Sequence, residues 1–376
     1  MNPQRHLLYE RLYNYVLDDI RKGSLRSGDR VPSEKELANK HGVSRITSMR
    51  ALQNLERAGV VERIRGKGTF VRRDLGRLPE LGDGQLPPLS RRLTSRIAFL
   101  IPDASPAYGL GLLNAIEERA GENGLTLVLK RSRGEQQEEE RAIEALVSSG
   151  SVDGMIVFPV NGEFYNASLL RLALAKRPLV LVDRYLKGIA ASSVATDNLA
   201  AARELTGSVL DSGHKHLAFV SSPPANTSSI EDRLHGFRAA FSQRGLGLGG
   251  QHLLTDLTSG FPNPESRIPA DHEAIRAFLE RRESITGFVA SEYPIALIIR
   301  DVLRDMQRLQ GTMIACFDSP SGQFVEPRFT HIQQNEREMG RLAVDLLLAQ
   351  LDGQPTPSQS IVPFELVRVP GAATIP

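Results

Sequence analysis

The 376-residue sequence contains one cysteine and no long apolar run, and each shortage excludes a class of protein. Cys316 has no partner for a disulfide within the chain, and its place in the apolar run GTMIACF favours a small buried side chain over a reactive thiol. No uninterrupted apolar run approaches the ~18 residues that a membrane span needs. Charges interrupt the N-terminal segment every few residues, so no export signal is predicted either, and we expect a cytoplasmic protein without a membrane partner.

The motifs of several enzyme and metal-binding classes are also missing. The chain has no G-x-x-x-x-G-K-[ST] phosphate loop and no G-x-S-x-G elbow, and no G-x-G-x-x-G turn follows the first predicted strand. The eight histidines do not fall at metal-binding spacings such as H-E-x-x-H. We therefore predict no catalysis, cofactor or metal. Two other classes of protein remain as alternatives for the part of the chain that binds a ligand: an enzyme, or a sugar-binding protein without a regulatory role.

Charge is concentrated at one end of the chain. The whole chain carries a formal charge of only +2, but residues 1–75 contain 16 Lys and Arg against 9 Asp and Glu. This distribution is typical of a small domain that contacts a polyanion and is attached to a mildly acidic body. Glycines and prolines interrupt every periodicity between Arg72 and Arg96. We predict a first domain at residues 1–73, a linker at 74–95 and a second domain at 96–376.

The first domain shows the pattern of three helices followed by a hairpin. Ser33 and Glu36 in PSEKELANKHG form a predicted capping box that starts the second helix. A third helix starts at Ser44, and its core face is formed by Ser48, Ala51, Leu52 and Leu55. The segment VVERIRGKGTFVRR alternates apolar and polar residues around a glycine-rich tip, which indicates a hairpin.

The second and third helices, joined by HGVS, predict a helix-turn-helix that places the third helix in the major groove of DNA. Its outward-facing candidates for DNA contact are Ser44, Arg45, Ile46, Thr47, Met49 and Arg50. Arg65 and Lys67 at the hairpin tip are placed to contact phosphates as a wing. Taken singly, Ser44 can serve only as a cap and the arginines only as a solvated helix face. Their order and the local positive charge favour DNA binding.

These residues also carry a resemblance. Tyr9 to Val71 resembles the winged helix-turn-helix of the GntR family of bacterial transcription regulators, through P-S-E-x-E-L-A, G-V-S-R-x-T and G-x-G-T-F-V. The resemblance implies contacts with a double-stranded DNA operator from Lys35, Ser44, Arg45, Thr47, Gly66 and Lys67. In one departure, Met49 stands where the family usually has arginine, and Arg50 follows it. We expect Ile46 and Met49 to contact thymine methyl groups.

After the linker, short apolar runs alternate with amphipathic segments of helical length. The pattern predicts an α/β fold, with parallel sheets covered by helices on both faces and room for two such lobes. The runs are RIAFLIP, GLTLVLK, VDGMIVFP, RPLVLVD, SSVATD, HLAFVSS, ITGFVAS and GTMIACFD.

Polar residues that close these runs are candidates for ligand binding, because doubly wound sheets bind ligands beyond the carboxyl ends of their strands. The candidates are Asp103, Asp183, Ser291 with Glu292, and Asp318. For the three aspartates the alternative is a structural role at the strand end. Polyols need fixed acceptors and fork-like donors for neighbouring hydroxyls, together with an aromatic face. Asp318 and Arg233 supply the acceptor and the donor in this interpretation.

Arg96 to Val369 resembles the effector-binding domain of the LacI/GalR repressors and the sugar-binding periplasmic proteins, in stretches such as PLVLVDRYL, EDRLHGFRAAF and ACFDSP. The resemblance implies an effector cleft that contains Arg233, Asp318, Gln334 and the aromatic residues Tyr108 and Tyr293. The usual Asn-Asp pair is replaced by Ser291 and Glu292, and the usual aromatic pair is reduced to Tyr108, so the ligand is expected to differ from an ordinary pentose or hexose. The combination resembles the arabinose-repressor type, which implies a homodimer that responds to a sugar or sugar derivative.

Overall fold

The computed structural model describes residues 8–57, 60–64, 67–72, 95–163, 166–189, 191–260, 262, 265–320, 322 and 325–369. The chain divides into two compact units, Met1–Leu93 and Thr94–Pro376. We call the first unit the head and the second unit the body. The predicted linker at residues 74–95 falls outside the described residues except for Ser95.

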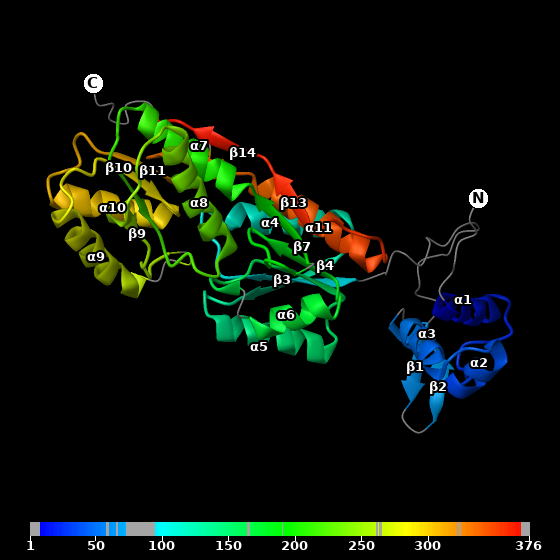
Figure 1. The fold of residues 1–376 in the computed structure, drawn as a ribbon. Coiled ribbons are helices and arrows are strands. Elements are labelled where there is room, and N and C mark those ends of the chain that lie inside the picture. Colours follow the sequence, from blue (N-terminus) through cyan, green and yellow to red (C-terminus); the bar gives the residue numbers. More distant parts are fainter. Residues whose placement is uncertain are drawn as a thin grey trace. The chain divides into compact units, whose positions relative to one another are not determined.

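The described residues of the head form three helices and an antiparallel hairpin, as the sequence predicts (Figure 1). Its elements are α1 (Leu8–Arg21), α2 (Glu34–His41), α3 (Arg45–Arg57), β1 (Val61–Ile64) and β2 (Gly68–Val71). The predicted capping box starts α2: Ser33 Oγ accepts from the Glu36 N–H at 3.3 Å, and Glu36 Oε2 accepts from the Ser33 N–H at 2.6 Å. Gly42, with φ 66°, ends the same helix in the left-handed conformation that glycine adopts without strain.

The core of the head confirms the predicted inner face of α3. Ser48, Ala51, Leu52 and Leu55 are all buried, and apolar side chains from α1, α2 and both strands pack against this face. The one polar member is satisfied, because Ser48 Oγ donates to the Glu34 carbonyl at 2.8 Å. This bond fixes the start of α3 against the start of α2, which is the junction that a helix-turn-helix must hold rigid.

The body consists of two lobes, each built on a six-stranded sheet. The strands of lobe 1 are β3 (Arg96–Ile101), β4 (Thr126–Arg131), β5 (Gly154–Val157), β6 (Leu179–Val182), β7 (Ser192–Thr196) and β13 (Gln359–Val362). Those of lobe 2 are β8 (Leu217–Val220), β9 (Leu253–Leu254), β10 (Gly287–Ala290), β11 (Met313–Phe317), β12 (Thr330–Gln334) and β14 (Phe364–Val367).

The strand orders are β13-β7-β6-β5-β3-β4 in lobe 1 and β14-β12-β11-β10-β8-β9 in lobe 2. The described pairings are parallel except that β14 runs antiparallel to β12. All eight predicted strands are observed, which confirms the predicted α/β class. The sequence analysis missed β9, β12, β13 and β14, because β9 has two residues and the other three mix polar and apolar side chains.

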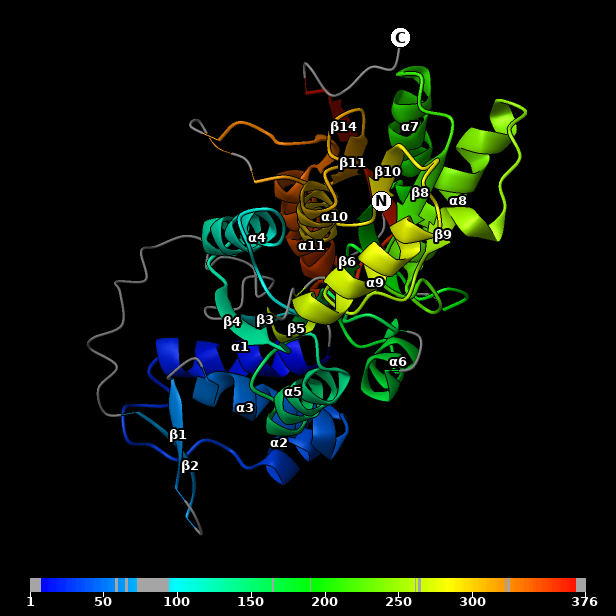
Figure 2. The same ribbon diagram turned by 90° about the vertical axis from the view of Figure 1, so that its left-hand side faces the viewer.

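Helices cover both faces of each sheet. Lobe 1 has α4 (Leu110–Glu122) and α11 (Glu336–Leu351) on one face, and α5 (Gln136–Ser149) and α6 (Ala167–Leu174) on the other. Lobe 2 has α7 (Asn198–Asp211) and α8 (Ser228–Gln243) on one face, and α9 (Ile268–Glu280) and α10 (Tyr293–Asp305) on the other. Figure 2 shows α4 and α11, which lie side by side although they are far apart in the sequence.

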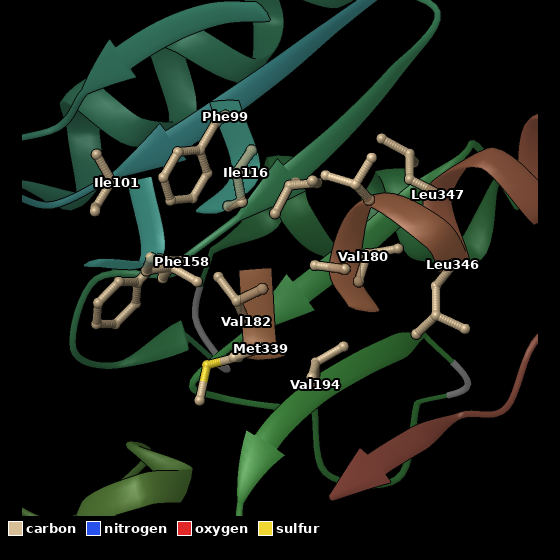
Figure 3. Close-up of a cluster of buried hydrophobic side chains, with 14 of the residues drawn as sticks. Phe99, Ile101, Ile116, Phe158, Val180, Val182, Val194, Met339, Leu346 and Leu347 are labelled. Atoms are coloured by element: carbon tan, nitrogen blue, oxygen red, sulfur yellow. The ribbon is translucent and has the colours of Figure 1, made fainter. Parts of the chain in front are cut away.

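The chain passes between the lobes three times: after β7, after β12 and between β13 and β14. At the second passage, the Asn335 side chain accepts a hydrogen bond from the Glu338 N–H and so caps the start of α11. Met339 and Leu347 on α11 then pack on Phe99, Val180 and Val194 in the core of lobe 1 (Figure 3). Lobe 1 is therefore completed by residues that follow most of lobe 2 in the sequence. None of the helices in the described part of the chain has the length and apolar character needed to cross a membrane.

Candidate functional site

The first turn of α3 presents a mixed polar and apolar surface. Ser44 acts as a cap, because its Oγ accepts from the Thr47 N–H at 3.1 Å and lies 2.7 Å from Thr47 Oγ1. The Arg45 side chain is 74% exposed and lies 3.6 Å from a Glu34 carboxylate oxygen. Ile46 is 72% exposed, so its side chain is accessible to a partner.

The remaining DNA-contact candidates vary in exposure. Lys35, Arg50 and Lys67 are exposed, whereas Met49 is half-buried. Arg65 and Gly66 lie outside the described residues. The hairpin is tied to the helices by Arg63 of β1, whose Nη2 donates to Glu34 Oε1 at 2.9 Å.

A cleft in the body receives side chains from both lobes. It has a volume of about 430 Å³, which includes a part open to solvent. The predicted residues that line it are Tyr108, Asp183, Arg233, Glu292, Tyr293 and Asp318; the others are Ser105, Ala107, Phe158, Arg184, Ser229 and Pro294. Ser291 and Gln334 do not line the cleft, but each contacts a residue that does. Of the predicted strand-end residues, Asp183, Glu292 and Asp318 line the cleft, and Asp103 does not. Ser291 contacts the cleft residue Arg233 through its backbone carbonyl.

Two aspartates close corresponding strands of the two lobes. Asp183 follows β6 with φ 68°, and Asp318 follows β11 with φ 63°. Each backbone N–H donates to the neighbouring strand, to the Val194 carbonyl at 2.9 Å and to the Ile332 carbonyl at 2.8 Å. Left-handed backbone conformations in residues other than glycine are uncommon and concentrate at functional sites, with aspartate among the residues that tolerate them. Both carboxyl groups are thereby held at the cleft.

Burial raises the pKa of two groups in the cleft, the Tyr108 hydroxyl and the Asp318 carboxyl. Tyr108 donates its hydroxyl to Asp183 Oδ1 at 2.6 Å, and burial together with this carboxylate raises the pKa of Tyr108 well above its ordinary value. Gln334 Nε2 donates to Asp318 Oδ2 at 2.8 Å. Burial raises the pKa of Asp318 to about 8, although Arg233 and the Gln334 hydrogen bond oppose the change. Near neutral pH, Asp318 is therefore largely protonated and can donate as well as accept hydrogen bonds.

Arg233 is held rigidly by its own lobe. It lies on α8 with 4% of its surface exposed. Its Nε donates to Asn198 Oδ1 at 2.7 Å, and its Nη1 donates to the Ser291 carbonyl at 2.6 Å. The guanidinium lies 3.9 Å above the Phe317 ring. This arrangement orients a buried cation toward the cleft before any ligand arrives.

Sequence reasoning missed Arg184 and Glu336. Arg184 lines the cleft; its Nη1 donates to the Pro159 carbonyl at 2.7 Å, and its Nε lies 3.4 Å from Asp183 Oδ2. Its position directly after the run RPLVLVD was the signal available in the sequence. Glu336 Oε1 accepts from the N–H groups of Gly109 and Leu112, which fixes the loop that carries Tyr108. No sequence pattern indicates this contact, because it joins segments that are distant along the chain.

Asp103 is the strand-end candidate that the structure places elsewhere. Its Oδ1 lies 2.5 Å from Arg131 Nη2 and accepts from the Ala104 N–H at 2.7 Å. These contacts fit the alternative given for Asp103 above, which is a structural role at the strand end. Within the described residues, no group of three or more His, Cys, Asp or Glu side chains is arranged to hold a metal ion.

Comparison with protein families assigns both units. Residues 8–71 match the family described as bacterial regulatory proteins, gntR family, and residues 206–369 match the periplasmic binding protein-like domain. The chain joins a GntR-type helix-turn-helix domain to a periplasmic-binding-protein-like domain. The resemblance found in the sequence is thus confirmed for the helix-turn-helix domain and, in the body, for residues 206–369.

Relatives that align with both units of the chain are transcriptional repressors. The arabinose metabolism transcriptional repressor of Halalkalibacterium halodurans is 26% identical over 353 residues, which cover 91% of this chain and 90% of the relative. The repressor CytR of Escherichia coli is 25% identical over 334 residues, covering 87% of this chain and 92% of that one. These relatives, which align with both units of the chain, are therefore all named as transcriptional repressors.

Solved structures share the fold of the body. The transcription regulator CcpA of Lactococcus lactis has a TM-score of 0.65 at 19% identity, covering 75% of this chain and 100% of that chain. A complex of the transcriptional regulator CelR with cellobiose has a TM-score of 0.62 at 20% identity, covering 90% of this chain and 98% of that chain. These similarities confirm the predicted architecture.

Proposed function

We propose that this chain represses carbohydrate-related genes by binding a DNA operator through its head, and that a small polar effector in the cleft of the body controls this binding. The observation that carries the proposal is the meeting of Asp183, Asp318 and Arg233 in one cleft, from two lobes. Two strand-end carboxyl groups and one guanidinium match the vicinal hydroxyls of a polyol. Tyr108 and Tyr293 supply aromatic surface for its C–H face. The effector is a sugar or a sugar derivative.

For the head, we propose that the first turn of α3 enters the major groove. Arg45 supplies paired donors for a guanine, and the exposed Ile46 contacts a thymine methyl group. Lys67 on the hairpin contacts the phosphate backbone as part of a wing. The cap formed by Ser44 fixes the direction in which α3 starts and therefore the direction of these side chains.

We further propose that the protein acts as a cytoplasmic homodimer without a catalytic step. Two heads then meet the two halves of a palindromic operator. The lobes are joined by three passages of the chain, so a ligand that contacts both lobes changes the angle between them. That change is transmitted to the heads as altered operator affinity.

A thermal-shift screen of neutral sugars, sugar acids and amino sugars on the full chain tests the effector proposal. A ligand present at 100 times its Kd stabilises the protein by ~2.7 kcal/mol. Asp318→Ala and Arg233→Ala are expected to lose the shift, whereas Asp103→Ala keeps it because Asp103 contacts Arg131 outside the cleft lining. Equal shifts in all three variants contradict the proposed cleft. A complete panel without a shift contradicts the sugar-type effector.

A further inference from the structure

A glutamate of lobe 1 is buried against the first turn of a helix of lobe 2. Glu163 follows β5 and has no exposed surface. Its Oε1 accepts two hydrogen bonds from Ser228, from the backbone N–H at 2.6 Å and from the hydroxyl at 2.7 Å. Ser228 is the first residue of α8, where backbone N–H groups lack partners within the helix and the helix dipole favours a negative charge. The carboxylate therefore holds this helix end from the opposite lobe.

Neighbouring segments of lobe 1 contact the same helix end. The Gly162 N–H donates to Thr227 Oγ1 at 3.0 Å. The Tyr185 N–H donates to Ser228 Oγ at 3.1 Å, and the Tyr185 hydroxyl donates to Asp232 Oδ2 at 3.1 Å. The loops after β5 and β6 thus both end on the first turns of α8. Separation of the lobes at this point breaks all of these bonds.

The same helix supplies the cleft. Ser229 and Arg233 both line it, and they lie one and five positions after Ser228 on α8. Because α8 is a rigid element, the position of its first turn sets where these two side chains stand relative to Asp183 and Tyr108 of lobe 1. Glu163 itself is not among the residues that line the cleft.

We infer that Glu163 is a positioning residue of the effector site, which latches α8 against lobe 1 and so holds Ser229 and Arg233 at the cleft when the lobes are closed. The inference rests on the proposed function, because it assigns a role in effector binding. It adds a residue that acts on the ligand through α8 rather than by contact.

The latch is built to be releasable. Glu163 Oε2 is buried without a hydrogen-bond partner among the described residues. Burial also raises the pKa of the Glu163 carboxyl, and the nearby Arg184 guanidinium opposes this change. A buried carboxylate oxygen without a donor loses the hydration that it regains when the lobes separate. This loss of hydration partly offsets the hydrogen bonds that hold the lobes together at this point.

Another contact between the lobes provides a matched control. Arg267 of lobe 2 lies 3.9 Å from Glu135 of lobe 1, with side-chain exposures of 53% and 64%. Exposed ion pairs at this distance contribute little. Removing the pair with Arg267→Ala is therefore expected to leave the lobe arrangement unchanged.

The test measures the distance between the lobes in the full chain without DNA or ligand. Spin labels are attached at Gln137→Cys on α5 and Glu273→Cys on α9, both exposed, whereas the native Cys316 is buried. Diluting labelled chains with unlabelled ones restricts the signal to pairs within one chain. Pulsed electron paramagnetic resonance then gives the proportions of closed and open lobes.

We expect the parent to show mainly the short distance between the labels. In Glu163→Ala we expect the ratio of open to closed lobes to rise by about tenfold or more, because two charge-assisted hydrogen bonds are lost. Glu163→Gln keeps an acceptor for Ser228 and is expected to fall between them, which a nonspecific structural defect does not produce. If Glu163→Ala does not fold, the comparison of Glu163→Gln with the parent decides the test. Unchanged distributions in both variants, or a parent already as open as Glu163→Ala, overturn the latch. Since no sugar is present, that result leaves the proposed effector function standing.

Discussion

Replacing Asp318 by asparagine is expected to stabilise the folded chain, and more strongly at pH 8 than at pH 5. Burial raises the pKa of Asp318 from the ordinary value of 3.8 to about 8. Between these two values the unfolded chain releases the Asp318 proton while the folded chain retains it, so stability falls as pH rises through this interval. The loss is complete above the folded-state pKa. Asparagine does not titrate, and the variant therefore escapes this loss.

The size of the effect follows from the width of that interval. Stability changes by ~1.4 kcal/mol per pH unit, so the roughly three units from pH 5 to pH 8 give a ceiling of ~4 kcal/mol. The hydrogen bond at this position can be kept. Gln334 now donates to Asp318, and its Oε1 has no partner among the described residues, so a flipped Gln334 amide can accept from asparagine. Asparagine also tolerates the φ of 63°. If local relaxation removes half of this ceiling, the stability advantage of Asp318→Asn over the parent should grow by ~2 kcal/mol between pH 5 and pH 8.

Calorimetric melting of the parent and Asp318→Asn at pH 5, 6.5 and 8 measures this effect. One kcal/mol shifts the Tm of a large domain by ~2 °C, so the advantage of the variant should grow by ~4 °C between the extremes. Asp103→Asn is the matched control, since its carboxylate pairs with Arg131 at a partly exposed position outside the cleft lining. A constant difference across the three pH values, or a variant less stable than the parent at pH 8, refutes the reasoning.

Further predictions concern the head, the cleft and the assembly. Arg45→Ala should weaken specific operator binding by ~1–3 kcal/mol, measured by fluorescence anisotropy, whereas Lys67→Ala should weaken all sequences similarly and lower the salt slope by ~1. Arg233→Lys keeps the charge but cannot reach both Asn198 Oδ1 and the Ser291 carbonyl, so effector affinity should fall at least ~10-fold by calorimetry; unchanged affinity counts against the cleft. The full chain should sediment as a dimer at micromolar concentration, and a monomer contradicts the proposed assembly.

The head was predictable because its structure is determined locally. The capping box of Ser33 and Glu36 and the buried face from Ser48 to Leu55 depend on residues within one or two helical turns. Such contacts leave a periodic pattern in the sequence. The turn HGVS is local too, and its Gly42 ends α2 in the left-handed conformation.

The body was predictable only where burial is continuous. Strands buried along their whole length, such as β6 and β11, appear as apolar runs. The edge strand β13 does not, because three of its four residues are not buried. In the cleft, Asp183 and Asp318 were recognisable as strand ends, whereas Glu163 and Glu336 gain their contacts from segments 65 and 227 residues away. No local pattern records contacts of that kind.

The central claim is that a ligand in the body controls DNA binding by the head. The most direct test titrates a fluorescent operator, identified by selection from genomic DNA, with the full chain in the presence and absence of the sugar that gives the largest thermal shift. Coupling between sites is typically ~1–3 kcal/mol, so the account predicts a change of ~5-fold or more in operator Kd, absent in Arg233→Ala. An operator Kd that stays constant while calorimetry shows the sugar bound to the parent contradicts the account.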